Sequence, residues 1–201
     1  MRMRNFIMAA AATLALAGMI TTSAVAQNGK GKGKGKGGPN LAPPINLTVS
    51  GWADGGVIPN KYTCAGGQNS PNPAMTWTAV PGAQSYAIIM HDPDPVMGGN
   101  AVDVTHWGIF DIPGDATSLP EGIPAGEQAN GTKQMANITG QPVYMGPCAP
   151  AGNGYHHYTI EMFALNSKLG LPNGAPRADV EKALTGKILA KRVYIGMFKQ
   201  D

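Results

Sequence analysis

The sequence predicts a mainly β fold, built on a central antiparallel sheet of sandwich type with one α-helix near the C-terminus. Short segments that alternate apolar and polar residues recur along the chain, and turn-forming Gly and Pro, with 28 and 17 copies, separate them. Helical periodicity is confined to one late stretch. Residues 41–201 hold these segments, and about 160 residues are enough for one domain with a hydrophobic core but too few for two.

Five segments ahead of the helix have the pattern of β-strands. Residues 45–49 and 75–79 alternate apolar with polar side chains, which is typical of strands with one exposed face. Residues 86–90 are apolar throughout, which indicates a strand that is buried on both faces. Residues 104–112 and 155–165 provide two longer strands.

The predicted helix covers residues 178–190. Val180, Leu184 and Ile188 recur every four residues, and at that spacing they form one apolar stripe of a helix. Residues 192–198 alternate again, and we expect them to form the closing strand of the sheet.

The first 26 residues have the composition of a secretory signal peptide. Two arginines precede an apolar run of about 15 residues, 6–20, and small residues at 24–26 provide a cleavage site after Ala26. An uncleaved membrane anchor is the alternative, although a bilayer span needs about 20 residues. The sequence therefore predicts export, to the periplasm or the medium.

Residues 27–40 alternate Gly with Lys and contain no apolar side chain, so we expect a flexible leader before the domain. Its lysines either contact anionic surfaces weakly or belong to a solvated spacer: Lys30, Lys32, Lys34 and Lys36. Six of the 15 basic residues lie before residue 41, whereas all 12 acidic residues follow, so the domain carries a net charge of about −3. The basic isoelectric point is therefore no argument for specific nucleic-acid binding.

All four histidines lie within one third of the chain, close to turn residues and to two carboxylates, and this clustering points to a polar pocket. Asp92 and Asp94 follow a buried strand, where the chain leaves the sheet and a carboxylate reaches the rim. Alternation places His156 and Tyr158 on one face of their strand and His157 on the other.

The same alternation places His106 on the face of Gly108, Phe110 and Ile112, with Trp107 on the opposite face. We expect the rim to hold this histidine together with the groups above. Imidazole and tyrosine donors bond phosphate oxygens, and a carboxylate orients an imidazole or accepts from an ammonium group.

Three motifs occur in a fixed order along the chain. They are Asp92-Pro93-Asp94, then His106-Trp107 with Asp111-Ile112-Pro113, then Gly146-Pro147-Cys148-x-Pro150-x-Gly152 with His156-x-Tyr158. Together they resemble the phosphatidylethanolamine-binding protein family, and its bacterial Raf kinase inhibitor-like branch fits best. Tyr62-Thr63-Cys64-x-Gly66 and Phe163-Ala164-Leu165 add to the resemblance, which runs from about residue 47 to residue 198.

The resemblance implies a β-rich fold with a central antiparallel sheet, a C-terminal helix and a small surface pocket for anions such as the phosphate of a phospholipid head group. The ligand-binding residues that it carries over are Asp92, Asp94, His106, Gly146, Pro147, His156 and Tyr158. We expect an exported binding protein for a phosphate-bearing or other small anionic ligand, with no cofactor, no metal and no enzyme activity.

Two positions depart from the family pattern. This chain has Pro95-Val96 where Ala-Pro is usual, and Ala149-Pro150 where two prolines are usual. Both changes concern the pocket wall, so they bear on head-group preference.

Other roles stay open for the same residues. His106, His156 and Tyr158 fit a hydrogen-bonded polar core, or a metal site with the aspartates, although the chain has no H-E-x-x-H pair. His91 and His157 are expected to be exposed or to stand behind the ligand contacts. The alternative function is an exported protease- or kinase-inhibitor-like protein that acts through a protein partner. A hydrolase is less favoured, because no nucleophile is visible beside an Asp–His pair.

Cys64 and Cys148 are the only cysteines, and in an exported chain they form a candidate disulfide. Such a bond closes a long loop and stabilises the fold by about 4 kcal/mol in the chain-entropy model. The alternative is two free thiols on neighbouring loops near the pocket, since a sequence does not set the Cα separation that a disulfide needs.

Overall fold

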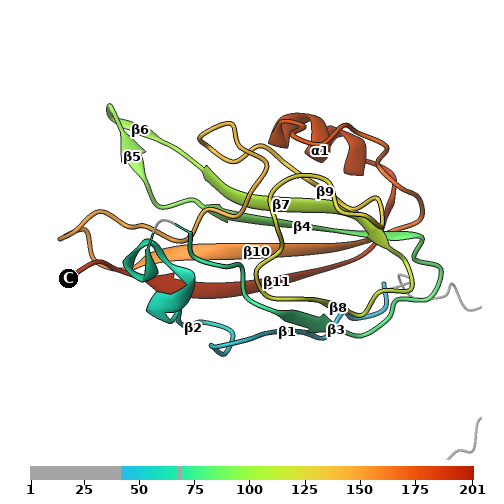
Figure 1. Cartoon of the computed structure of the whole chain (residues 1–201), viewed down its shortest axis with the longest axis horizontal. Helices are drawn as coiled ribbons and strands as arrows, with labels where there is room; N and C mark the ends of the chain where they lie inside the picture. The colour runs from blue at the N-terminus through green and yellow to red at the C-terminus, as the bar shows by residue number, and fades with distance from the viewer. Residues whose placement is uncertain (1–41, 68) are drawn as a thin grey trace, which may run out of the picture. The chain divides into compact units, whose positions relative to one another are not determined.

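In the part of the chain that the structure describes, a six-stranded sheet, a facing three-stranded sheet, a two-stranded sheet and one α-helix form the domain (Figure 1). The computed structural model describes residues 42–67 and 69–201. The predicted signal peptide, 1–26, and leader, 27–40, lie outside the described residues. Within the described part, no helix has the length and apolar character needed to cross a membrane.

The elements follow one another along the chain in a fixed order. They are β1 (Leu47–Val49), β2 (Gly56–Val57), the 3-10 helices η1 (Asn60–Tyr62) and η2 (Cys64–Gly66), β3 (Met75–Trp77), β4 (Ser85–Asp92), β5 (Val96–Met97), β6 (Asn100–Ala101), β7 (Val104–Pro113), β8 (Ser118–Leu119), β9 (Lys133–Gln134), β10 (His156–Leu165), α1 (Arg177–Leu184) and β11 (Ile188–Phe198).

The large sheet has the strand order β2-β11-β10-β4-β7-β9 and is antiparallel except where β2 pairs with β11. One face packs against the small sheet β1-β3-β8, through residues such as Ile88 and Met75. The other face packs against α1, through residues such as Ile89 and Val180. The predicted mainly β fold with a central antiparallel sheet is therefore confirmed.

Burial on both faces explains why strand β4 has a continuous apolar sequence. All eight residues of β4 are buried, because its two faces contribute to the two different cores. A strand with no exposed face needs apolar side chains in both alternating sets, and residues 86–90 supply them. All five segments predicted ahead of the helix contain a strand.

The helix is shorter than the periodicity predicted. It ends at Leu184, Gly186 takes a left-handed backbone with φ 76°, and β11 begins at Ile188. Glycine tolerates this conformation, which ends helices. Ile188 therefore belongs to a strand, where it pairs with Leu165 and is 46% exposed. The strands of two residues were not predicted, because two residues are too few to show a period.

Strand β7 breaks the alternation on which its face prediction rested. Met90 of β4 pairs with Trp107, but the next residue, His91, pairs with Thr105, so His106 is an extra residue in a β-bulge. The ring of His106 lies edge-on against Tyr158, with the centroids 5.1 Å apart. Trp107 and Tyr158 belong to the core on the side of the small sheet, whereas Phe110 belongs to the core on the helix side. The prediction that His106 and Trp107 point to opposite faces, with His106 on the face of Phe110, is therefore wrong.

A second irregularity in β7 centres on Asp111, the one non-Gly residue with positive φ (56°) among the described residues. Its buried carboxylate accepts hydrogen bonds from the backbone N–H groups of Leu169 (2.6 Å) and Gly170 (3.2 Å). These bonds tie the chain after β10 to the helix-side core, and they offset the strain of the left-handed backbone.

Replacing Asp111 by alanine should lower the free energy of unfolding by about 2–3 kcal/mol, because the buried N–H of Leu169 loses its acceptor while the backbone strain stays. Urea denaturation measures the change. Asp115→Ala is the matched control, since Asp115 is exposed and should shift stability by no more than about 0.5 kcal/mol. Equal effects of the two substitutions would contradict this role of Asp111.

Candidate functional site

A buried Asp–His pair stands where β4 ends and β10 begins. The two strands are antiparallel neighbours, so the last residue of β4, Asp92, lies close to the first residue of β10, His156. Nδ1 of His156 lies 2.7 Å from Oδ2 of Asp92, and both side chains are buried. Because a carboxylate only accepts, this nitrogen carries the proton. The other oxygen, Oδ1, accepts from the backbone N–H of Asp94 at 3.0 Å.

His106 is held from the opposite side of the site. Its Nδ1 lies 3.1 Å from the carbonyl oxygen of Met145 and donates to it. Burial lowers the pKa of His106 below its ordinary value, since a charged imidazolium is poorly solvated there. The neutral ring then presents Nε2 as a hydrogen-bond acceptor.

Tyr158 lies beneath these groups and is fully buried. Its hydroxyl accepts a hydrogen bond of 3.1 Å from the backbone N–H of Cys148. Burial, and then the nearby charge of Asp92, raise the pKa of Tyr158, so the hydroxyl keeps its proton. The tyrosine supports His106 and the 146–150 loop from below.

A pocket of about 220 Å³ opens over the Asp–His pair. Its polar end consists of Asp92, His106, His156 and Asn153. Its walls are mainly apolar and consist of Pro95, Val96, Met97, Val104, Met145 and Pro150, with Cys148 beside them. No Lys or Arg lines it within the described chain, so the polar end has to act through imidazole, amide and carboxylate groups.

Three of the seven predicted ligand-binding residues line this pocket, and four lie around it. Tyr158 forms its support, and Gly146 and Pro147 belong to the loop behind Cys148. At Gly146 a Cβ would meet the carbonyl oxygen of Tyr62 at 2.9 Å, so glycine permits the close packing of this loop. The carbonyl oxygen of Pro147 accepts from the N–H of Cys64 at 3.0 Å.

Asp94 is exposed and is oriented by His157. Its Oδ2 accepts from the backbone N–H (2.6 Å) and from the imidazole Nδ1 (2.9 Å) of His157. Although burial works in the opposite direction, these hydrogen bonds and the nearby imidazoles lower the pKa of Asp94. The carboxylate is therefore ionised at neutral pH, and it lies close to Asp92 and His156, which line the pocket.

The other two histidines do not line the pocket. His157 is exposed and bonds only Asp94 among the described side chains. His91 is buried, and its Nδ1 lies 2.6 Å from Asp103, which is also bonded to Arg177 of α1. It therefore belongs to the helix side of the sheet, away from Asp92.

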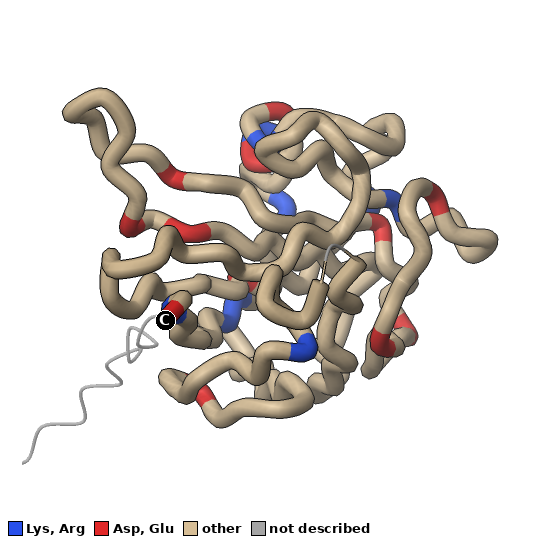
Figure 2. The backbone as a smooth tube through the Cα atoms, turned by 60° about the vertical axis from the view of Figure 1, so that its left-hand side comes forward, with Lys and Arg blue, Asp and Glu red and all other residues tan. Residues whose placement is uncertain are grey.

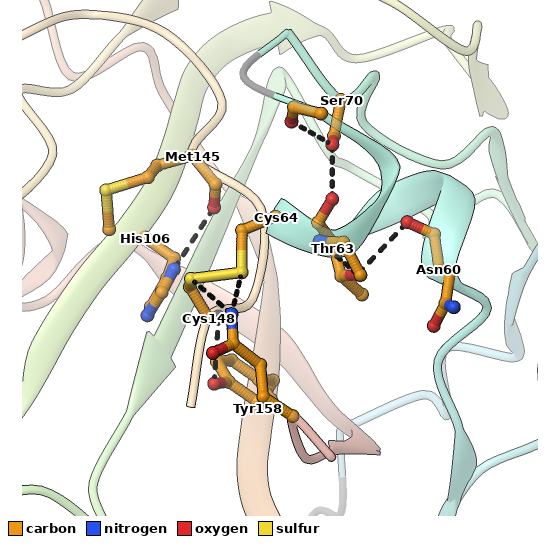
Figure 3. Close-up of a disulfide and its surroundings, with 11 residues drawn as sticks. Asn60, Thr63, Cys64, Ser70, His106, Met145, Cys148 and Tyr158 are labelled. Carbon is orange, nitrogen blue, oxygen red and sulfur yellow. Dashed lines mark hydrogen bonds between the residues drawn. A yellow bond between two sulfur atoms is a disulfide. The ribbon is translucent and has the colours of Figure 1, made fainter. Parts of the chain in front are cut away.

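The candidate cysteines form a disulfide in the structure, with their Cα atoms 5.3 Å apart (Figure 3). The bond joins η2 to the loop that carries Cys148, and Nε2 of Gln200 lies 2.8 Å from the sulfur of Cys64. Two separate links thus hold Cys148: its sulfur to Cys64 and its N–H to Tyr158. These two links hold the pocket wall in place at Cys148.

The sequence analysis placed Pro95, Val96 and Pro150 on the pocket wall, but it missed the other apolar lining residues, Met97, Val104 and Met145. Val96 and Met97 come from β5, which pairs with β6 to form a hairpin. A signal for the hairpin was available, because Gly98-Gly99 follows the apolar pair Val96-Met97 and Gly-Gly is typical of tight hairpin turns.

Asp92, Asp94 and His156 are the residues that could hold a metal ion, since one ligand atom from each lies within 4.8 Å of the others. The contacts are already made within the group, because Oδ2 of Asp92 bonds Nδ1 of His156 and Oδ1 bonds the N–H of Asp94. A metal would have to replace these bonds.

The sheet pair, the buried Asp–His couple and the small mixed pocket define a β-sandwich binding protein. The family model described as phosphatidylethanolamine-binding protein matches residues 48–199. The chain belongs to this family.

Relatives and solved structures agree with this assignment. A UPF0098 protein of Aquifex aeolicus is 44% identical over 150 residues, which cover 74% of this chain and 84% of that protein. A Mycobacterium tuberculosis protein named as a lipoprotein, LppC, is 33% identical over 159 residues, covering 79% and 74%. A phosphatidylethanolamine-binding protein homolog from Chlamydia trachomatis superposes with a TM-score of 0.68 at 25% identity, covering 78% and 98%. E. coli YBCL, described as a new member of the mammalian family, gives the same TM-score and identity, covering 78% and 99%.

The lipoprotein name of one relative and the disulfide together indicate an exported protein, because disulfides persist in oxidising compartments.

Removing the disulfide with the double substitution Cys64→Ala and Cys148→Ala should lower the free energy of unfolding by about 4 kcal/mol, since the bond closes a loop of 84 residues in the unfolded chain. Urea denaturation with and without reductant measures it: reductant should destabilise the wild type and leave the double variant unchanged. A thiol reagent that finds two free thiols in unreduced, denatured wild type would contradict the bond.

Proposed function

We propose that this protein is an exported binding protein whose pocket takes a small phosphate-bearing ligand, such as a phospholipid head group. The buried Asp92–His156 pair, at the polar end of a pocket that His106 also lines, supports this most directly. Family membership supports a binding role. The signal-peptide pattern, with cleavage after Ala26, fits the same reading.

The imidazoles have a specific requirement for binding an anion. His156 uses its Nδ1–H on Asp92, and His106 uses its Nδ1–H on the carbonyl of Met145. Each ring can therefore donate to a phosphate oxygen only when Nε2 is protonated as well. An anion in this pocket binds together with a proton, which supplies the positive charge that the lining lacks.

The carboxylates suit an ammonium group on the same ligand. Both hydrogen bonds from His157 go to Oδ2 of Asp94, which leaves Oδ1 as an acceptor. Because Asp94 is ionised, it can pair with an ammonium group near the pocket. Phosphoethanolamine carries a phosphate and an ammonium group and is the probe that tests both contacts.

The lining supports binding rather than covalent catalysis. Its described residues include no Ser, Thr or Lys, and its one cysteine, Cys148, is in the disulfide. These are the side chains that most often act as nucleophiles.

His156→Ala should weaken phosphoethanolamine binding at least about tenfold, because a hydrogen bond to a charged group is worth about 1.5–3 kcal/mol. Isothermal titration calorimetry measures the affinity, and circular dichroism checks the fold. The matched control is His91→Ala, which removes a buried histidine bonded to an aspartate on the opposite face of the sheet. A similar loss in both variants, or none in His156→Ala, would argue against the pocket.

Phosphate affinity should rise as the pH falls from 8 to 6. The lowered pKa of His106 keeps its ring neutral in the free protein, so binding has to take up a proton, and proton uptake becomes less costly at lower pH. Titrations with inorganic phosphate in two buffers of different ionisation enthalpy give the number of protons taken up. An affinity that is flat across this range, with no proton uptake, would contradict the mechanism.

A further inference from the structure

The β5–β6 hairpin projects from the sheet end where the pocket opens (Figure 1). The N–H of Val102 bonds the carbonyl of Pro95 at 2.9 Å and closes its base. Gly98 and Gly99 form the turn, with φ values of 58° and 81°. Two successive positive φ values are typical of a tight hairpin turn that matches the strand twist. The projection is therefore an ordered structural element.

Its side chains are unusual for a projection into water. Val96 is 70% exposed and Met97 is 56% exposed, the two highest values for large apolar side chains among the described residues. The sequence has no charged residue between Asp94 and Asp103. In Figure 2 the hairpin accordingly carries neither basic nor acidic colouring, and acidic positions stand below it. An exposed apolar projection is informative, whereas a single exposed apolar residue is not.

We propose that this hairpin docks the protein on the surface of a zwitterionic lipid bilayer, with Val96 and Met97 inserted at the level of the head groups. The identity of the ligand that the pocket binds on the bilayer rests on the proposed function. The docking step itself depends only on the hairpin.

Continuity with the pocket supports a bilayer. Val96 and Met97 also line the pocket, so one surface runs from the apolar hairpin to the polar end at Asp92 and His156. A phospholipid in a membrane likewise has an apolar region that is followed by a phosphate, so its two parts match the hairpin and the polar end of the pocket. A pocket built for a free anion alone would gain nothing from an exposed apolar edge.

The charge of the domain and of the hairpin indicates which lipids the bilayer contains. The domain carries a net charge of about −3, and the hairpin has no basic side chain that could attract anionic lipid. Two apolar side chains without cationic support give weak and reversible insertion into a neutral surface. We therefore assign phosphatidylcholine and phosphatidylethanolamine bilayers as the partner.

A tryptophan reporter tests the insertion. All three native tryptophans are buried: Trp52, Trp77 and Trp107. The fluorescence of an added exposed tryptophan is therefore measured above their constant background. Met97→Trp should shift its emission to the blue on zwitterionic vesicles and be quenched by brominated phosphatidylcholine. The control is Ile188→Trp, because Ile188 is 46% exposed and lies at the opposite end of the β10–β11 pair from His156. No shift for Met97→Trp, or equal quenching of both variants, would overturn the proposal.

Vesicle sedimentation gives the second test. The double substitution Val96→Ser and Met97→Ser should lower partitioning onto phosphatidylcholine–phosphatidylethanolamine vesicles at least about tenfold, and Ile188→Ser should not. A wild type that does not sediment with these vesicles would overturn the proposal and favour a protein partner for the hairpin. Phosphoethanolamine titration in solution separates the two ideas: no binding there, with vesicle docking retained, would refute the proposed ligand and leave the docking surface standing.

Discussion

The geometry of the site depends on one buried carboxylate. Asp92 sits at the end of a strand whose residues are all buried, and a charge in that position is costly unless hydrogen-bond donors surround it. His156 and the backbone N–H of Asp94 are the donors. The first fixes the start of β10 against the end of β4. The second turns the chain sharply after β4, so that the next residues leave the sheet as a hairpin beside the pocket. Satisfying one charge thus positions the polar end and one wall together.

The opposite wall is positioned by covalent and backbone links. Cys148 is joined to Cys64, and its N–H bonds the hydroxyl of Tyr158, which in turn packs against His106. The carbonyl of Met145, in the same loop, accepts from His106. The imidazole therefore lies between the sheet and the loop and bonds to the loop directly. A site assembled in this way has little freedom to change shape at its polar end, and the hairpin side carries the exposed apolar surface.

Much of this could be predicted from the residues. Alternation predicted the short strands β1 and β3, a continuous apolar run predicted β4, and the period of two correctly placed His156 and Tyr158 on one face of β10. The face of His106 could not be predicted, because a β-bulge adds one residue without leaving a mark in the apolar pattern. The helix was extended too far because Ile188 continued its stripe across a glycine. The disulfide was one of two alternatives until the structure brought Cys64 and Cys148 together. Pro95 and Val96 were expected on the pocket wall, but the β5–β6 hairpin that carries Val96 and Met97 was not predicted, because strands of two residues are too short to show a period.

The edge of the large sheet has a consequence for the behaviour of the protein in a crowded solution. Strand β2 pairs with β11 only at Gly196 and Met197, so among the described residues most of β11 has no neighbouring strand on that side. Unpaired strand edges recruit other chains and start aggregation. Lys191 and Arg192 lie on this stretch and are held by Glu161 and Asp54. An approaching strand would have to displace or bury these ion pairs, which disfavours edge-to-edge pairing with another chain.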